Sequence, residues 1–328
     1  MKKPEIGGLF MAGLPGTALD GSTQELIEEL RVGSFILFKR NVAEPDQLRR
    51  LCGDLRAACL AAGLPAPLIA IDQEGGTVTR LPPPFTQFPD ARVLAAAADP
   101  WRALTDYGRT CARELREIGV NMNLAPVLDV CPAGKGCFME RRALGEDPGE
   151  VARLGRVVIS AMQDEGVAAC GKHFPGLGAA VLDPHERLPR VDRSLPELRR
   201  LDLPPFREAA AEAAAIMTSH TLYPALDPEW PATLSRPILT GLLREEIGFT
   251  GVIVTDDLEM GAIEKEGPLD EAALRAFEAG ADLLLICHDH GKVRRAREKL
   301  AAAAGRIPPS RIAASLARIA AVRSRFAS

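Results

Sequence analysis

The sequence predicts a closed barrel of eight parallel β-strands, each followed by a helix. Eight short apolar runs recur along the chain, at residues 6–11, 34–38, 68–71, 122–128, 167–170, 215–217, 252–254 and 283–286. These runs are continuously apolar, as strands buried on both faces of a parallel sheet are. Amphipathic stretches separate the runs, and polar residues crowd the ends of several of them. Eight strands alternating with helices favour a (β/α)8 barrel over an open doubly wound sheet.

The amphipathic stretches predict the helices of this barrel. They are clearest at residues 23–30, 46–62, 103–118, 150–165 and 195–214, and two more follow at 292–304 and 309–326. Asp147 before Pro148 is typical of a helix start. Three consecutive prolines at 82–84 indicate a loop. Because no linker or repeat interrupts the pattern, we expect one domain over residues 1–328 that ends in C-terminal helices.

The composition is that of an ordinary globular protein, with 47% apolar and 26% charged residues. The formal net charge of −4 gives no reason to expect binding to nucleic acid or to an anionic membrane surface. No window holds about 18 consecutive apolar residues, so we expect no membrane span. The expected partner is a small molecule, and the expected oligomeric state is a monomer.

The cysteines indicate a reducing compartment. There are seven of them, an odd number, and no two form a CxxC pair. Neither a disulfide framework nor a structural zinc site is therefore expected. The N-terminus has two lysines but no apolar run of signal-peptide length. These features together predict a cytoplasmic location.

Two adjacent acids, Asp256 and Asp257, follow the apolar run at 252–254. Reactive groups of a parallel barrel lie just past the C-terminal ends of its strands. Side chains alternate along a strand, so the two acids cannot both face the barrel mouth if the strand continues through them. One would face the site, and the other would serve a loop or cap the next helix. The residues alone leave this choice open.

A second group of polar residues follows the run at 68–71. Asp72 precedes two glycines, Gly75 and Gly76, and Arg80 comes next. The glycines permit a turn with positive φ and a close approach of the backbone. Asp72 could bind hydroxyl groups, and Arg80 could clamp a polar substituent. The alternative is an ion pair between Asp72 and Arg80 that only closes the loop.

Lys172 and His173 follow the run at 167–170. A lysine at a strand end could form a Schiff base, as in an aldolase. His173 could make a structural hydrogen bond, or it could join His220 of the neighbouring strand as a weak candidate for metal binding. We predict no metal site and no cofactor.

Asp183 and His185 flank Pro184 in a long loop. An aspartate two residues from a histidine can orient the imidazole and raise its pKa. This arrangement suits a general acid and base near neutral pH. The triplet is common, however, and by itself decides nothing.

Taken together, these segments resemble the family 3 glycoside hydrolases, in particular the bacterial β-N-acetylhexosaminidases of cell-wall recycling. The resemblance covers roughly residues 6–290. It rests on six motifs in order: FILFKRN (35–41), AIDQEGGTVTR (70–80), NLAPVLDV (123–130), RALGEDP (142–148), GKHFPGLG with DPH (171–185) and GFTGVIVTDDLEMGAI (248–263).

The resemblance implies a hydrolase that releases a terminal β-linked N-acetylglucosamine with retention of configuration. It implies that Asp256 is the nucleophile, that His185 is the proton donor and that Asp183 is the carboxylate partner of His185. It also implies that the sugar is bound by Asp72, Arg80, Arg142, Lys172 and His173. A His–Asp pair would then replace the second carboxyl group that retaining enzymes normally use.

The sequence departs from the family pattern at three positions. Leu177 replaces the histidine of the usual GHG, Pro184 replaces a small residue, and Arg141 stands where glutamate is commoner. The first two positions bear on loop closure and on the preference for the leaving group. At the third position, Arg141 stands beside Arg142, so the family's arginine could align with either residue.

Four alternatives to this function remain open at the level of the sequence. The chain could be a β-glycosidase of another sugar specificity, or a phosphorylase, because a histidine acid tolerates anionic phosphate better than a carboxylate does. It could also be a barrel that binds sugar without turnover. An aldolase acting through Lys172 is the last of the four.

Overall fold

The fold is described from a computed structural model, in which residues 6–180, 188–264 and 267–327 are placed. Eight parallel strands form one sheet in the order β7-β6-β5-β4-β3-β2-β1-β8. They are β1 (Phe10–Gly13), β2 (Ser34–Leu37), β3 (Leu68–Ile71), β4 (Met122–Asn123), β5 (Ala168–Phe174), β6 (Ala215–Thr218), β7 (Val252–Val254) and β8 (Leu284–Ile286).

The two ends of this sheet meet between β7 and β8, which nearly closes a barrel. Val254 and Leu283 form a parallel bridge. The Thr255 amide donates to the Leu283 carbonyl at 3.0 Å, and the Asp282 amide donates to the Ile253 carbonyl at 2.8 Å. The predicted (β/α)8 fold class is therefore confirmed.

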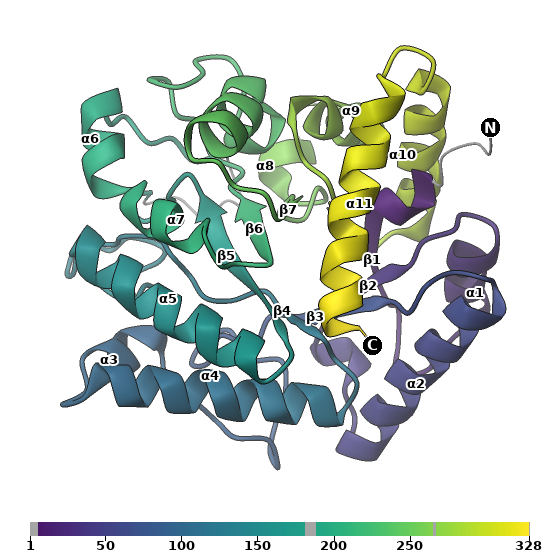
Figure 1. Cartoon of the computed structure of the whole chain (residues 1–328), viewed down its shortest axis with the longest axis horizontal. Coiled ribbons are helices and arrows are strands. Elements are labelled where there is room, and N and C mark those ends of the chain that lie inside the picture. The colour runs from purple at the N-terminus through teal and green to yellow at the C-terminus, as the bar shows by residue number, and fades with distance from the viewer. Residues whose placement is uncertain (1–5, 181–187, 265–266, 328) are drawn as a thin grey trace.

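Every strand residue is buried. This is why the runs in the sequence are continuously apolar, since one face packs inside the barrel and the other packs under the helices. The structure's helices are α1 (Gly21–Glu28), α2 (Pro45–Ala61), α3 (Ala91–Ala95), α4 (Pro100–Glu117), α5 (Pro148–Asp164), α6 (Leu195–Leu201), α7 (Pro204–Ala209), α8 (Gly261–Glu264), α9 (Leu269–Ala279), α10 (His290–Ala303) and α11 (Pro309–Phe326). Figure 1 shows them arranged outside the strands.

Shorter helical segments complete the chain. They are the 3₁₀ turns η1 (Ile6–Leu9), η2 (Lys39–Asn41) and η3 (Ala232–Leu234), and the π-helical η4 (Pro237–Glu246). Asp147 caps α5 as predicted, because its side chain accepts a hydrogen bond from the Glu150 amide. In the placed part of the chain, no helix is both long enough and apolar enough to cross a membrane.

Several predicted elements differ from the observed ones, and three of the differences have a clear cause in the sequence or in the backbone. The run at 6–11 begins as η1, and its strand extends to Gly13. The strand predicted at 122–128 is only two residues long, because Pro126 has no amide hydrogen for the ladder and a single bridge joins Val127 to Lys172. The helix predicted at 195–214 is divided into α6 and α7, since two prolines interrupt it at 204 and 205.

The C-terminal helix α11 covers the end of the barrel opposite the strands' carboxyl ends. Arg323 of α11 donates to the Gly33 carbonyl just before β2, at 2.8 Å. Arg311 and Arg318 lie 3.4 and 3.1 Å from the carboxylate of Asp282, just before β8. In Figure 1, α11 is the yellow helix that ends near the label C.

Candidate active site

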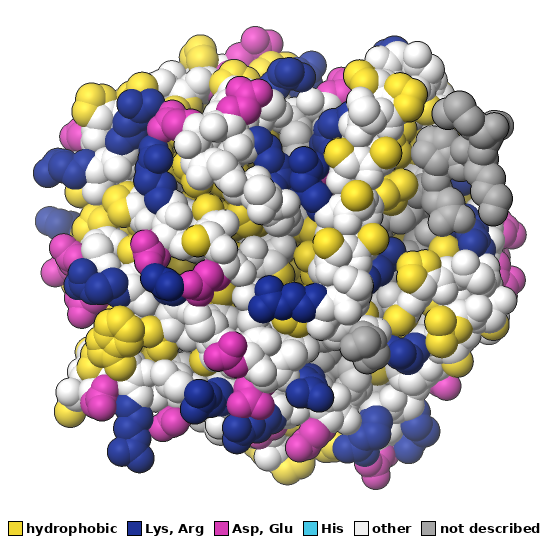
Figure 2. All heavy atoms as spheres, in the orientation of Figure 1, with side chains coloured by type: hydrophobic (Ala, Val, Ile, Leu, Met, Phe, Trp, Pro, Cys, Tyr) yellow, Lys and Arg dark blue, Asp and Glu magenta, His cyan; other side chains and the backbone are white. Residues whose placement is uncertain are grey.

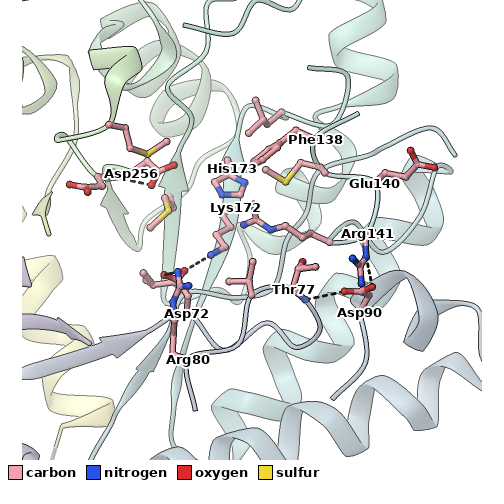
Figure 3. Close-up of a pocket in the computed structure, with 18 of the residues that line it drawn as sticks. Asp72, Thr77, Arg80, Asp90, Phe138, Glu140, Arg141, Lys172, His173 and Asp256 are labelled. Carbon is pink, nitrogen blue, oxygen red and sulfur yellow. Dashed lines mark hydrogen bonds and ion pairs between the residues drawn. The ribbon is translucent and has the colours of Figure 1, made fainter. Parts of the chain in front are cut away.

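A cavity of about 950 Å³ opens at the carboxyl ends of the strands. This volume lies at the upper end of the range for small-ligand sites, about 300–1,000 Å³. Figure 3 shows Asp256 at one end of the cavity, Asp90, Glu140 and Arg141 at the other, and Lys172 and His173 between them.

The predicted site residues converge on this cavity. Asp256 and the five residues expected to bind the sugar all contribute to its lining: Asp72, Arg80, Arg142, Lys172 and His173. Asp183 and His185 lie outside the described residues, as does Pro184.

A buried cluster of charged side chains forms the wall in the middle of the cavity. Lys172 Nζ lies 2.7 Å from Asp72 Oδ1 and 2.7 Å from Glu74 Oε1. Arg142 binds Glu74 through two nitrogens, Nε at 2.9 Å and Nη2 at 2.7 Å. Arg142 therefore enters the cluster, whereas Arg141 pairs with Asp90 at 2.7 Å. Glu74 was not predicted as a site residue, although it stands in the motif at 70–80.

The cluster fixes the charges of its members. Burial alone would lower the pKa of Lys172, but Asp72 and Glu74 together raise it above its ordinary value. Burial opposes the ionisation of Glu74, yet Arg142 and Lys172 hold the pKa of its carboxyl well below the usual range. Lys172 is therefore an ammonium ion bound between two carboxylates. An ammonium has no lone pair to attack a carbonyl, so the geometry disfavours the aldolase alternative.

Arg80 joins the edge of this cluster. Its Nη2 lies 3.2 Å from Asp72 Oδ2, so the ion pair considered as the alternative role does form. The Arg80 amide also donates to Gln73 Oε1 at 2.9 Å, which closes the loop. Arg80 Nε is nevertheless buried without a hydrogen-bond partner in the described part of the chain. A buried donor left unpaired costs about 1–3 kcal/mol.

His173 is held by Asp129. His173 Nδ1 lies 2.8 Å from Asp129 Oδ2, and the amide of Leu177 donates to Asp129 Oδ1 at 2.6 Å. Asp129 is fully buried. The sequence reasoning missed Asp129, although it is the only acid of the motif at 123–130. Leu177, which departs from the family pattern, thus supplies its backbone amide to this arrangement and its side chain to the cavity wall.

Asp256 and Asp257 both line the cavity, because β7 ends at Val254 and the alternation of a strand no longer applies. Asp256 is partly exposed and accepts a hydrogen bond from the Asp257 amide at 2.8 Å. Asp257 Oδ1 accepts from the amides of Glu259 and Cys287, at 3.1 and 3.2 Å. Asp257 therefore serves the loops. Burial, with the nearby charges of Glu259 and Asp256, raises the pKa of Asp257 to about 7.

Of the two histidines considered for metal binding, His220 is committed to protein contacts through both ring nitrogens. His220 Nε2 lies 2.8 Å from the Asp257 carbonyl oxygen, and His220 Nδ1 lies 2.8 Å from Thr233 Oγ1. Among the residues that the structure places, no three His, Cys, Asp or Glu side chains are grouped to hold a metal ion.

The family model for the glycosyl hydrolase family 3 N-terminal domain matches residues 4–322. The chain belongs to this family. Its family 3 relatives include the beta-hexosaminidase of Alkalilimnicola ehrlichii, which is 42% identical over 289 residues, covering 86% of this chain and 81% of that protein. The beta-hexosaminidase of Pseudomonas aeruginosa is 37% identical over 308 residues, covering 93% and 90%.

Solved family 3 structures share the whole fold. The β-N-acetylglucosaminidase of Paenibacillus has a TM-score of 0.95 and 42% identity; the match covers 100% of this chain, which spans only 63% of that longer protein. The β-N-acetylhexosaminidase of Beutenbergia cavernae has a TM-score of 0.89 and 30% identity, covering 98% of each chain. The NagZ protein of Neisseria gonorrhoeae, solved with N-trifluoroacetyl-D-glucosamine, has a TM-score of 0.84 and 33% identity, covering 97% and 92%.

Proposed function

We propose that this family 3 chain is a retaining, exo-acting β-N-acetylglucosaminidase. The observation that carries the proposal is the placement of the Asp256 carboxylate at the end of a cavity whose centre is a buried cluster of hydrogen-bonding ions. The relatives named above as hexosaminidases and N-acetylglucosaminidases support the assignment of N-acetylglucosamine as the sugar that is released. So does the N-acylated glucosamine bound to the Neisseria protein.

In the proposed mechanism, an Asp256 oxygen attacks the anomeric carbon. A carbon–oxygen bond forms to the enzyme while the bond to the leaving oxygen breaks, and a proton is delivered to that oxygen. By similarity to the family, we assign the role of proton donor to His185. We assign to Asp183 the role of orienting the His185 imidazole. A water molecule then releases the sugar from Asp256, with the same imidazole acting as base.

The ionic cluster supplies the proposed binding site for the sugar hydroxyls. Asp72 can accept from hydroxyl groups, and Lys172, Arg80 and Arg142 can donate to their oxygens. The ring of His173 is fixed by Asp129, and His173 Nε2 has no partner among the described residues. This nitrogen is therefore positioned to contact a substrate hydroxyl. Because these side chains are already held by one another, binding orders few new rotamers.

We further propose that the substrates are cell-wall fragments and that the protein works in a reducing compartment, the cytoplasm. All seven cysteines are buried and none is paired in a disulfide, which supports a reducing environment. The cell-wall origin of the substrate rests on the resemblance alone.

The test is hydrolysis of a panel of aryl β-glycosides that differ at the 2-position, by the wild type and by Asp256→Ala. We expect turnover of the 2-acetamido substrate by the wild type and its abolition in Asp256→Ala, with unchanged circular dichroism. Asp106→Ala, on the exposed face of α4, is the matched control.

Each other result points to a specific alternative. Substantial residual turnover in Asp256→Ala overturns the assignment of the nucleophile. Preference for a 2-hydroxyl substrate indicates another β-glycosidase, and a sugar 1-phosphate formed when phosphate is added indicates a phosphorylase. Calorimetric binding of N-acetylglucosamine without any turnover indicates a binding protein.

A further inference from the structure

The turn after β7 that carries Asp256, residues 255–258, is held on one side by β8. The Leu285 amide of β8 donates to Thr255 Oγ1 at 2.9 Å. The Leu258 amide donates to the Leu285 carbonyl at 3.0 Å. These bonds fix both ends of the turn, and Asp256 lies between them.

A histidine that follows the neighbouring strand holds the turn from the other side. His220 lies two residues after the end of β6, and its Nε2 is 2.8 Å from the carbonyl oxygen of Asp257. β6 and β7 are paired in parallel, so their carboxyl ends meet at the same edge of the barrel. His220 is 1% exposed and is not among the described residues that line the cavity. It therefore contacts the turn and not the sugar.

The partners of His220 fix the orientation of its ring. A carbonyl oxygen only accepts, so Nε2 carries a proton and donates it to Asp257. His220 Nδ1 lies 2.8 Å from Thr233 Oγ1, and this hydroxyl lies 2.6 Å from Thr218 Oγ1. Both threonines are fully buried. Hydrogen bonds shielded from water are strong and costly to leave unpaired, so rotation of the ring is costly.

Asp257 transmits this constraint to Asp256 through its backbone. Its carbonyl accepts from His220 Nε2, and its amide donates to Asp256 Oδ1 at 2.8 Å. Two hydrogen bonds with one residue between them thus connect the imidazole to the carboxylate proposed as the nucleophile. A shift of Asp257 would move the backbone next to Asp256 and also the donor that holds one of the Asp256 carboxylate oxygens.

We infer that His220 is a positioning residue, which holds the Asp256 carboxylate at attacking distance through the backbone of Asp257. The inference rests on the proposed function. Attack requires reacting atoms about 3–3.5 Å apart, and a misplacement of about 1 Å can cost about 100-fold in rate. The proposed sugar-binding residues Asp72 and Lys172 belong to the ends of β3 and β5. His220 should therefore affect the attack and not the affinity for the sugar.

Two substitutions separate the donor from the rest of the ring. In His220→Gln, the side-chain amide nitrogen can take the place of Nε2 and donate to the Asp257 carbonyl. In His220→Asn, the shorter side chain reaches the place of Nδ1 beside Thr233 but does not reach the Asp257 carbonyl. The two variants are therefore similar in polarity and differ in the hydrogen bond that the inference requires.

The measurement is the rate at which 2-acetamido-2-deoxy-5-fluoro-β-glucosyl fluoride labels Asp256, followed by mass spectrometry. In this reaction a bond forms between an Asp256 oxygen and the anomeric carbon while the carbon–fluorine bond breaks. Fluoride leaves without a proton, so the rate reports on the nucleophile and not on the proposed proton donor. We expect labelling to be about 10- to 100-fold slower in His220→Asn and close to the wild-type rate in His220→Gln.

Calorimetry with N-acetylglucosamine separates positioning from a general structural role. We expect both variants to bind the sugar with wild-type affinity, and the number of sites counts the folded protein to which each labelling rate refers. Thr240→Val is the matched control. Thr240 also donates from its side chain to a backbone carbonyl, that of Ala279 at 2.7 Å, and it is not among the described residues that line the cavity. We expect this variant to be labelled at the wild-type rate.

Labelling of His220→Asn at the wild-type rate overturns the inference, and so does equal slowing of His220→Asn and His220→Gln or of Thr240→Val. Sugar binding that weakens in parallel with labelling also overturns it, because His220 would then support the whole site. If His220→Asn does not fold, His220→Gln carries the test, and slow labelling of that folded variant overturns the inference. A wild type that is not labelled at Asp256 contradicts the proposed function instead, so the two failures are distinguishable.

Discussion

Asp129 acts on the site without facing the substrate. Its Oδ2 orients His173, and its Oδ1 accepts the backbone amides of His173 in β5 and of Leu177 just after β5. In Asp129→Asn the amide oxygen can still accept from the backbone, but the amide nitrogen faces His173 Nδ1. An amide nitrogen only donates, so His173 Nδ1 must then accept the hydrogen bond. The proton of the His173 ring therefore moves to Nε2, which faces the cavity.

We therefore expect Asp129→Asn to fold normally and to lose activity. Loss of a hydrogen bond to a charged group corresponds to about 1.5–3 kcal/mol, so kcat/KM for an aryl substrate should fall by roughly 10- to 100-fold. Steady-state kinetics with a melting curve checks this. If the folded variant shows wild-type kinetics, the role of His173 in catalysis does not require Asp129 to orient its ring.

The raised pKa of Asp257 makes the free energy of unfolding depend on pH. Its pKa in the folded chain, about 7, lies above the unfolded value of about 3.8. The folded state therefore holds this proton more tightly, and the associated stability is present at low pH and is lost as the pH rises from about 4 to about 7. Asp257→Asn removes the charge and keeps an oxygen for the Glu259 and Cys287 amides.

The variant should match the wild type in free energy of unfolding below about pH 4 and exceed it by up to ~4 kcal/mol above pH 7, at about 1.4 kcal/mol per pKa unit. Denaturant unfolding at a series of pH values measures this difference. A difference that does not vary with pH shows that Asp257 ionises normally.

At the scale of elements, Asp282 joins the last helix to the barrel. It is fully buried and contacts three arginines: Arg244 of η4, and Arg311 and Arg318 of α11. The Ile253 amide donates to Asp282 Oδ2, the oxygen that Arg244 also contacts, at 3.0 Å. Removal of one partner from such a group leaves buried charges uncompensated, which costs about 3–5 kcal/mol.

Asp282→Ala should therefore lower the free energy of unfolding by several kcal/mol while leaving kcat/KM close to wild type below its melting temperature. Glu278→Ala is the control, because its ion pair with Arg306 is largely exposed and its loss should change stability by less than about 1 kcal/mol. Equal stability of the two variants would show that α11 is not anchored at Asp282.

The elements also show what could be read from the sequence. All eight strands were predicted, because strands buried on both faces leave unbroken apolar runs. Helix α9 was missed and residues 195–214 were read as one helix, since the apolar pattern there outweighed the two prolines. Glu74 and Asp129 were missed because their partners, Arg142 and His173, lie 68 and 44 residues away, and only folding brings them together.

At the scale of the whole molecule, Figure 2 shows acidic and basic side chains interspersed over the visible face. The cysteines, in contrast, are all buried and unpaired. Burial raises the pKa of Cys52 and of Cys170 to about 12, so little reactive thiolate forms at neutral pH.

We expect a thiol reagent to label seven cysteines in denaturant and to label the native protein only slowly, and we expect reductant to leave the melting temperature unchanged. Mass spectrometry after alkylation counts the thiols. Fewer than seven in denaturant reveals a disulfide, and rapid labelling of the native protein reveals local opening.

The closure of the barrel through β8 has a consequence for synthesis on the ribosome. β8 pairs with β1 and meets β7, and Asp282 just before it needs the arginines of α11, near the end of the chain. A nascent chain that already contains the acids of β3 and β7 therefore cannot yet assemble them around one cavity. Synthesis adds about 5–20 residues per second, so several seconds separate the emergence of β7 from that of α11, and the chain is inactive throughout this interval. Stalled chains that end before β8 should be protease-sensitive and without hydrolase activity, and both properties should change together once α11 is released.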